Sequence, residues 1–228
     1  MSFAYLIRHA QASAHAEDYD QLSSLGYEQS KLLHQHLLSQ PRPIDHVWVG
    51  PRKRHRQTYE TVRQSTWPEA EHKSWLDEFP AHEIMDKGIE TLRGTEWQPD
   101  IDLIEASVGT GGESYLRILQ YLCDLWIEDA LFLEDVETCS SYKARIQAGL
   151  QELQHILDRG ESVIIFSSAG LICSTLGVAM QADDKLSLRN AWSIYNASIQ
   201  ILRSFQQQYM MVGFNWIHHI PSNKRTFV

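Results

Sequence analysis

Short apolar runs alternate with longer segments of mixed polarity along most of the chain. Residues 3–7, 46–50 and 162–166 are dominated by apolar side chains, which is typical of strands buried on both faces of a parallel sheet. Two further strands are predicted over residues 197–202 and 209–214. Residues 75–79 are interpreted as a third strand or a loop.

The segments between these strands have the apolar spacing of helices. Residues 140–159 are the clearest case, because Ile146, Leu150, Leu153 and Leu157 recur at intervals of four, three and four. The other predicted helices run from Ser23 or Ser24 to the residue before Pro41, and over residues 52–65, 116–126 and 169–180. This alternation predicts an α/β fold with three layers: a mostly parallel open sheet with helices on both faces.

The composition is that of a globular protein with one sizeable core. The 228 residues are 43% hydrophobic with 12 Gly and 7 Pro, so we interpret residues 1–228 as a single domain. The 20 Lys and Arg against 29 Asp and Glu give a net charge of -9. Nucleic acid is therefore not expected as a partner, since its phosphates are bound by basic surfaces.

Most of the negative charge lies in one segment. Residues 80–136 hold 13 acidic and 3 basic side chains, a net charge of -10, so the rest of the chain is close to neutral. We interpret this segment as an insertion that forms a cap over the site and selects the substrate. Its charge disfavours highly anionic ligands such as inositol polyphosphates.

Neither a membrane nor an oxidising compartment is indicated. The chain has no uninterrupted apolar run of about 18 residues, the length that a membrane span requires. Its three cysteines, Cys123, Cys139 and Cys173, are far apart and lack CxxC spacing, which indicates free thiols and a cytoplasmic location. The spacing of histidine and acidic residues implies no metal site, and no cofactor is expected.

Candidate chemistry follows directly after three of the predicted strands. Arg8 and His9 follow the first strand, a basic stretch over residues 52–56 follows the second, and residues 167–170 begin a helix after the 162–166 strand. Ligands of open α/β sheets bind at these strand ends, and a helix N-terminus suits an anion. A neutral histidine can attack phosphorus while arginines hold the phosphoryl oxygens. The alternative is that Arg8 and His9 only cap a strand and the basic stretch is a solvated face.

Segments spread along the chain resemble, in order, those of one protein family. The segment "LIRHAQAS" resembles the N-terminal signature of the histidine phosphatase superfamily, also called phosphoglycerate mutase-like, whose usual form is RHG or RHA. Three others, "YDQLSSLGYEQSKLL", "GPRKRHRQTYET" and "SVIIFSSAGLI", are similar to its LTxxGxxQA helix, its SPLxRAxQTA stretch and its VSHGG turn. Further similarities are found in "LDEF", "ETCSSYKARIQAGL", "NASIQIL" and "FNWIHHI". The resemblance covers nearly the whole chain, with the acidic segment as a variable insertion.

The resemblance implies a role for individual residues. His9 corresponds to the nucleophile that becomes phosphohistidine, and Arg8 and Arg54 correspond to the phosphate-binding arginines. Glu78 of "LDEF" falls where the family has its proton donor, a group that must hold its proton until transfer. Its alternative interpretation is an ordinary surface carboxylate. Further substrate-binding residues implied by the N-terminal signature are Gln11 and Ser13.

The chain also departs from the family pattern. Ser168 stands where VSHGG has a second histidine, and Gly50, Arg52 and His55 replace the serine, leucine and alanine of SPLxRA. Loss of one preorganised donor typically slows a reaction about 100- to 1,000-fold, so Ser168→His is expected to raise turnover if the pocket is otherwise intact. We hypothesise that a basic residue within about 8 Å of His9 replaces the missing imidazole. The candidates are His55, Arg56, His218 and His219.

The resulting functional prediction is a metal-independent phosphomonoesterase that works through a phosphohistidine intermediate. Ser168 assists in substrate binding, and the loss of the second histidine weakens the enzyme. The alternative is a catalytically inactive phosphate-binding or regulatory protein of the same fold. The expected partner is a small-molecule phosphoester or inorganic phosphate, with no membrane and no nucleic acid, and a homodimer is compatible with the sequence.

Overall fold

A computed structural model describes residues 2–13, 19–40, 42–106 and 112–227. The chain divides into two compact units. The first consists of Met1–Glu78 and Arg145–Val228, and the second of Phe79–Ala144. Each unit is described by itself below.

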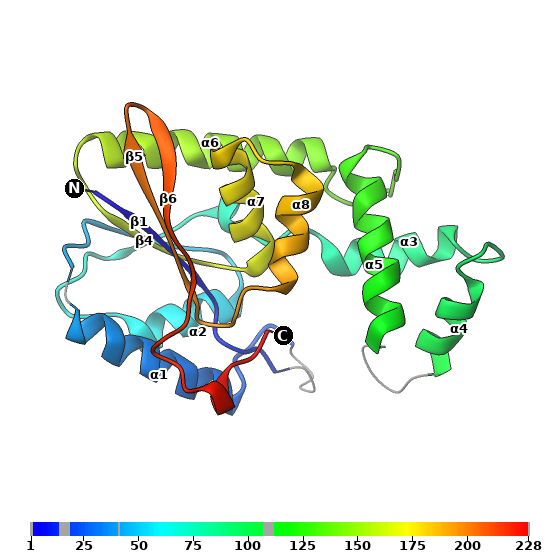
Figure 1. Cartoon of the computed structure of the whole chain (residues 1–228), viewed down its shortest axis with the longest axis horizontal. Helices are drawn as coiled ribbons and strands as arrows, with labels where there is room; N and C mark the ends of the chain where they lie inside the picture. Colours follow the sequence, from blue (N-terminus) through cyan, green and yellow to red (C-terminus); the bar gives the residue numbers. More distant parts are fainter. Residues whose placement is uncertain (1, 14–18, 41, 107–111, 228) are drawn as a thin grey trace. The chain divides into compact units, whose positions relative to one another are not determined.

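The first unit is built on a six-stranded sheet with the strand order β3-β2-β4-β1-β5-β6 (Figure 1). The four strands β1 to β4 run parallel, whereas β5 pairs antiparallel with β1 and β6 antiparallel with β5. This mixed open sheet confirms the predicted α/β fold class. The strands are β1 (Ala4–Arg8), β2 (His46–Val49), β3 (Ala70–His72), β4 (Val163–Ser167), β5 (Ile199–Phe205) and β6 (Gln208–Trp216).

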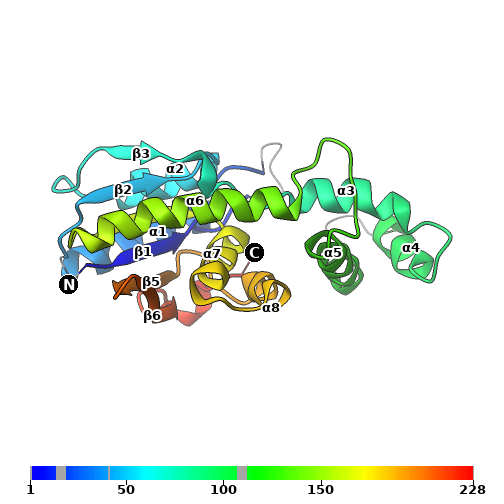
Figure 2. The ribbon, with the colours of Figure 1, turned by 90° about the horizontal axis from the view of Figure 1, so that it is seen from above.

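Helices cover both faces of this sheet (Figures 1 and 2). Helices α1 (Ser24–Ser39) and α2 (Lys53–Val62) lie on one face. The opposite face carries α7 (Ala169–Met180), which packs with α8 (Asp184–Arg189), and the part of α6 (Cys139–Asp158) that belongs to this unit. Three 3-10 turns complete the unit, at Ser74–Leu76, Asn190–Trp192 and Ser222–Lys224.

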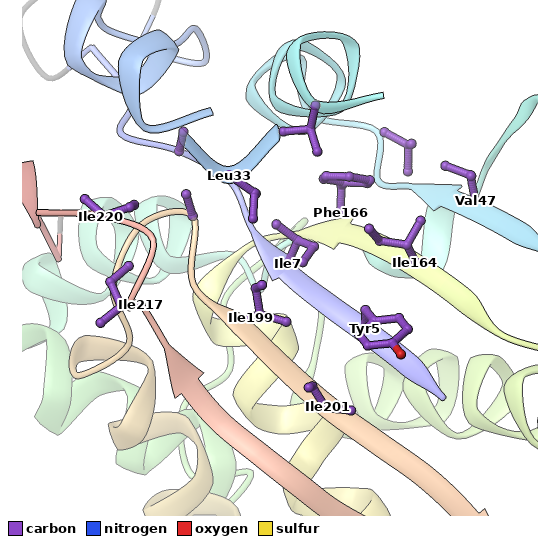
Figure 3. Packing of buried hydrophobic residues seen from close by; sticks show 14 of the residues in the cluster. Tyr5, Ile7, Leu33, Val47, Ile164, Phe166, Ile199, Ile201, Ile217 and Ile220 are labelled. Atoms are coloured by element: carbon purple, nitrogen blue, oxygen red, sulfur yellow. The ribbon is translucent and has the colours of Figure 1, made fainter. Parts of the chain in front are cut away.

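The core lies on both sides of the parallel strands, because their side chains are buried on both faces. On the side of α1 and α2, Leu33 and Val62 join a cluster that contains Ile7, Ile164 and Phe166 (Figure 3). Alternate side chains such as Leu6, Trp48 and Ile165 are buried on the opposite face. Such near-continuous apolar strands are what a sheet between two helical layers requires.

The close packing of α6 on the sheet depends on a glycine. The ring of Trp75 packs edge-on to Trp48, with 6.1 Å between the ring centroids. A Cβ atom on Gly149 of α6 would lie 2.3 Å from the Trp75 ring, so only glycine fits where the helix crosses this side chain. Trp75 itself lies in the 3-10 turn, so of the two alternatives for residues 75–79 the strand is wrong, whereas residues 77–79 form a loop.

The second unit is helical, and its bounds enclose the whole of the predicted acidic insertion, residues 80–136. Its helices are α3 (Ala81–Thr91), α4 (Gln98–Ala106), α5 (Gly112–Ile127) and the first residues of α6. A buried core includes Ile84, Ile101, Ile118 and Leu122. The rings of Trp126 and Tyr142 complete it with their centroids 5.5 Å apart. That this unit acts as a cap stays a prediction.

In the described part of the chain, no helix combines the length and the apolar character that crossing a membrane would require.

Candidate active site

The carboxyl ends of β1, β2 and β4 bring the predicted site residues together. In the sheet register Arg8 is paired with Ser167, and Val49 with Phe166, so the segments that follow these strands start at the same edge. The main-chain N–H of His9 donates to the carbonyl of Ser167 over 2.8 Å. His9 therefore lies beside the turn that carries Ser168, as the strand-end argument predicts.

Two hydrogen bonds fix the tautomer of His9. Its Nδ1 lies 2.7 Å from the carbonyl oxygen of Ala10, which can only accept, so Nδ1 carries the proton. Its Nε2 lies 3.1 Å from Nε of Arg54 and accepts that N–H. Burial, followed by the positive charges of Arg54 and Arg8, holds the pKa of His9 well below its ordinary value. His9 is therefore a neutral imidazole whose Nε2 lone pair faces the arginine.

Arg54 is the centre of the site's hydrogen bonds. Its Nε donates to Nε2 of His9, as described above. Its Nη1 forms an ion pair with Oδ1 of Asp20 at 3.0 Å, and its Nη2 donates to Oγ of Ser168 at 3.3 Å. Asp20 also accepts the main-chain N–H of Lys53 at 2.7 Å and so caps the start of α2. Hydrogen bonds to His9, Asp20 and Ser168 thus fix the position of the guanidinium.

Arg8 brings a second positive charge to the site. Its guanidinium is buried and Nη1 donates to the carbonyl of Ile194, while Nε has no hydrogen-bond partner among the described residues. Burial lowers its pKa to about 10, which leaves it charged at neutral pH. A buried charged N–H without an acceptor is costly, and an anionic oxygen would satisfy it.

Glu78 lies at the first turn of α7. Its two carboxylate oxygens accept the main-chain N–H groups of Gly170 at 3.2 Å and Leu171 at 2.8 Å. The N–H groups expected to be free for an anion are thus bound by a carboxylate of the chain itself. Arg145 holds the preceding turn, because its guanidinium donates to the carbonyls of Trp75, Asp77 and Glu78.

Of the four residues predicted as replacements for the missing second histidine, His55 lies in the site. The ring centroid of His55 is 5.8 Å from that of His9, and its Nε2 is 2.6 Å from Oγ of Ser168. His219 instead stacks on another histidine, with 5.2 Å between centroids, and Arg56 donates to the carbonyl of Pro51. His218 is exposed. His55 is thus the candidate that bonds directly to Ser168.

The sequence and the fold agree on the family. Residues 4–120 match the model of the histidine phosphatase superfamily (branch 1). The chain belongs to this superfamily. The matched region contains Arg8, His9, Arg54 and Glu78, whereas Ser168 lies beyond it.

Solved structures of similar fold align with almost the whole chain. A phosphoserine phosphatase mutant from Entamoeba histolytica in complex with phosphoserine has a TM-score of 0.65 at 14% identity, covering 97% of this chain and 100% of that chain. The alpha-ribazole phosphatase from Shigella flexneri has a TM-score of 0.62 at 17% identity, covering 93% and 96%. A mycobacterial glucosyl-3-phosphoglycerate phosphatase in complex with VO3 has a TM-score of 0.60 at 18% identity, covering 95% and 100%. These identities establish a shared fold. A comparison with curated protein sequences gives no significant match.

Uncharged residues of the superfamily motifs fix the loop that follows His9. The main-chain N–H of Ala10 donates to Oγ1 of Thr58 at 3.1 Å, and that of Gln11 to Oε1 of Gln29 at 2.9 Å. A Cβ atom on Gly26 would lie 2.2 Å from the carbonyl oxygen of Gln11, so this helix position requires glycine. In this histidine phosphatase the Gly, Gln and Thr of the helical motifs thus hold the loop that follows the nucleophile candidate.

The two remaining predicted residues lie on the same loop. The side-chain oxygen of Gln11 accepts from Oγ of Ser23, the N-cap of α1, at 2.8 Å. Ser13 donates its main-chain N–H to the carbonyl of Gln21 at 2.8 Å. No described contact joins either side chain to His9 or Arg54. Substrate binding by Gln11 and Ser13 stays a prediction.

Two residues that hold the site were not identified from the sequence. Asp20, the ion-pair partner of Arg54, follows two other acids, Glu17 and Asp18, in a polar segment and carries no periodic signal. Asn196 donates from Nδ2 to the main-chain carbonyl of His9 at 3.2 Å. It opens the "NASIQIL" segment, so its place in a superfamily segment is the signal that could have found it.

Proposed function

We propose that this histidine phosphatase is a metal-independent phosphomonoesterase whose nucleophile is His9. The observation that carries the proposal is the neutral His9 ring, held with its proton on Nδ1 and its Nε2 toward Arg54. An attacking imidazole must be unprotonated at the nitrogen that attacks. Two buried guanidiniums, Arg8 and Arg54, supply the positive charge that a phosphoryl group needs.

The reaction proceeds in two displacements. The Nε–H of Arg54 turns from Nε2 of His9 to a phosphoryl oxygen, which frees the lone pair of Nε2. Nε2 then attacks phosphorus and the bond from phosphorus to the ester oxygen breaks, while Glu78 gives a proton to the leaving oxygen. Water then attacks the phosphohistidine, the P–N bond breaks, Glu78 takes a proton back and inorganic phosphate leaves. To act as an acid, Glu78 has to exchange its contacts with Gly170 and Leu171 for the substrate. Ser168 stands where the superfamily has its second histidine, and its hydroxyl lies beside Arg54.

The proposed substrate is a small phosphomonoester. Phosphoserine is bound by one protein of similar fold, and the net charge of -10 on residues 80–136 disfavours polyanions if that segment caps the site. The second candidate function is an inactive phosphate-binding protein. It is favoured by one observation: Glu78 occupies the α7 amides as a helix cap rather than standing free as an acid.

The test is hydrolysis of para-nitrophenyl phosphate by the wild-type protein and by His9→Ala, in EDTA, from pH 4.5 to 8. We expect turnover by the wild type that His9→Ala abolishes and that EDTA leaves unchanged. Trapping of acid-labile, base-stable phosphate on the wild-type protein would support the covalent step. Equal background rates in both proteins would reject the enzyme and favour the binding protein, for which inorganic phosphate affinity is measured next.

A further inference from the structure

The departures at Gly50, His55 and Ser168 meet at one point in the structure. His55 and Ser168 are both fully buried, and Nε2 of His55 lies 2.6 Å from Oγ of Ser168. The same hydroxyl accepts from Nη2 of Arg54 at 3.3 Å. The His55 ring is 5.8 Å from the ring of His9, between centroids. An imidazole from α2 therefore occupies the neighbourhood of the turn that follows β4.

Gly50 makes the room for this imidazole. A Cβ atom at Gly50 would lie 2.3 Å from Nδ1 of His55 and 2.8 Å from the carbonyl oxygen of Leu76. Contacts this short do not occur in folded proteins, so the serine of the SPLxRA motif and the ring of His55 exclude each other. The glycine at position 50 and the histidine at position 55 are thus linked by sterics.

Relative to the superfamily pattern, an imidazole and a small side chain have changed places. The motif SPLxRA has alanine at the position of His55, and VSHGG has histidine at the position of Ser168. We propose that His55 supplies the second imidazole of the phosphate site and acts on the phosphoryl group through the hydroxyl of Ser168. The inference rests on the proposed anion site of His9, Arg8 and Arg54 and adds a positioning residue to it.

In the free site a chain of hydrogen bonds ends on His55. Nη2 of Arg54 donates to Oγ of Ser168, and Oγ lies 2.6 Å from Nε2 of His55. Nε2 accepts the hydroxyl proton when the ring carries its own proton on Nδ1. Burial, followed by the positive charges of Arg54 and Arg52, holds the pKa of His55 well below its ordinary value. Arg56 on α2 and the His9 ring are the other charged or titratable groups that face it. The imidazole is therefore neutral in the free site, and only the negative charge of a bound phosphoryl group can favour its protonation.

Binding of a phosphomonoester monoanion reverses the direction of the hydrogen bond between Ser168 and His55. The monoanion passes its proton to Oγ of Ser168, and Oγ passes its own proton to Nε2 of His55, so the substrate becomes the dianion and His55 the cation. Nε2–H then donates to Oγ, and Oγ–H donates to a phosphoryl oxygen. The positive charge that the superfamily places on a histidine after β4 is delivered here from α2, one hydroxyl away. Release of phosphate returns the proton.

The test is to remove the imidazole from position 55 and to place one at position 168, where the superfamily has its second histidine. His55→Ala, Ser168→His and the double variant H55A/S168H are compared with the wild type in kcat and KM for para-nitrophenyl phosphate and in affinity for inorganic phosphate by calorimetry. We expect His55→Ala to lower kcat/KM about 100-fold, the size of one lost preorganised donor. Contrary to the expectation from the sequence, Ser168→His alone gives no gain, because the buried His55 ring lies against position 168 and fills the space. H55A/S168H recovers most of the loss of His55→Ala.

The matched control is His34→Ala. His34 is a partly buried histidine that also supports α2, since its Nδ1 donates to the carbonyl of Val62 at 2.8 Å, but at the far end of the helix. It should keep wild-type kcat/KM. His55→Gln, which keeps the volume but not the titration, serves if His55→Ala fails to fold. Its kcat/KM should fall as well.

Two results overturn the inference. One is a folded His55→Ala or His55→Gln with wild-type kcat/KM and wild-type phosphate affinity. The other is a folded H55A/S168H no better than His55→Ala, which makes His55 a packing residue. If the wild type hydrolyses nothing, the proposed enzyme fails, and the inference is decided by the affinity for inorganic phosphate alone: His55→Ala must weaken it and H55A/S168H must restore it.

Discussion

At the scale of single residues, the site is organised by which groups are kept neutral and which stay charged. Arg8 remains charged although it is buried, since its pKa falls only to about 10. The positive charges of Arg54 and Arg8 help to keep His9 neutral. Asp20 offsets part of that positive charge through Nη1 of Arg54. The imbalance that remains is what an incoming phosphoryl group neutralises.

Glu78 has two roles that substitution can separate. Glu78→Gln keeps an oxygen that can accept an α7 amide but removes the acid, so we expect kcat to fall about 100-fold or more with little change in Tm. Glu78→Ala loses the cap as well, which lowers the free energy of unfolding by about 1 kcal/mol. Steady-state kinetics and thermal melting of both variants check this. An unchanged kcat in Glu78→Gln would reject Glu78 as the proton donor and leave it only the role of capping α7.

At the scale of elements, the predicted strands and helices of the sheet unit match the observed ones to within a few residues. Buried strands and the two-sided core leave a strong apolar pattern, so β1, β2, β4 and α7 were predictable. The edge strand β3 was missed because its sequence, Ala70–His72, is short and mostly polar. Helices α3 and α4 were missed because they are short and lie in the acidic segment that was interpreted as an insertion, and the six-residue helix α8 was missed as well.

The site was predictable where it follows strand ends and unpredictable where it depends on loop paths. Arg8, His9 and Arg54 converge because parallel strands end at one edge. The cap formed by Glu78 and the ion pair of Asp20 require the course of two irregular loops, which no periodic pattern encodes. His55 was predicted only as one of four candidates to replace the missing imidazole, and its contact with Ser168 was not predicted.

The glycine of α6 gives a prediction at this scale. Gly149→Ala places a methyl group against the ring of Trp75, and overpacking of this kind costs about 1–3 kcal/mol. Urea denaturation followed by circular dichroism measures the change in the free energy of unfolding. Gln151→Ala, at an exposed position of the same helix, is the control and should stay close to the wild type. Equal midpoints for both variants would contradict the packing argument.

At the scale of the whole molecule, charge and buried histidines determine how the protein responds to its surroundings. The basic residues Lys87, Arg93 and Arg117 of the acidic segment bond to oxygens of their own unit. The acidic excess of residues 80–136 is therefore available to act on ligands by its field. A cytoplasmic location and a homodimer both stay predictions, and light scattering of the purified protein decides the second.

The pH dependence of stability follows from the buried histidines. Burial, followed by the neighbouring His36, lowers the pKa of His219 to about 4 in the folded protein, against an ordinary value of 6.5. The unfolded chain therefore binds more protons between these values, and stability falls as pH drops from about 6.5 to about 4, by roughly 3 kcal/mol from this residue. Urea midpoints across that range should show a shallower decline in His219→Asn. An identical slope would contradict the assignment.

The missing side chain at Gly50 constrains the order in which this site could have evolved. An imidazole at position 55 collides with any Cβ at position 50, whereas a glycine at 50 can be tolerated before the histidine arrives. If His55 supplies the second imidazole as we propose, the glycine has to be present before the histidine at position 55, and a histidine after β4 is dispensable only once His55 is in place. Related sequences should show positions 50, 55 and 168 changing together. A relative that lacks the second histidine but has the glycine at position 50 and the histidine at position 55 should not be classified as catalytically inactive.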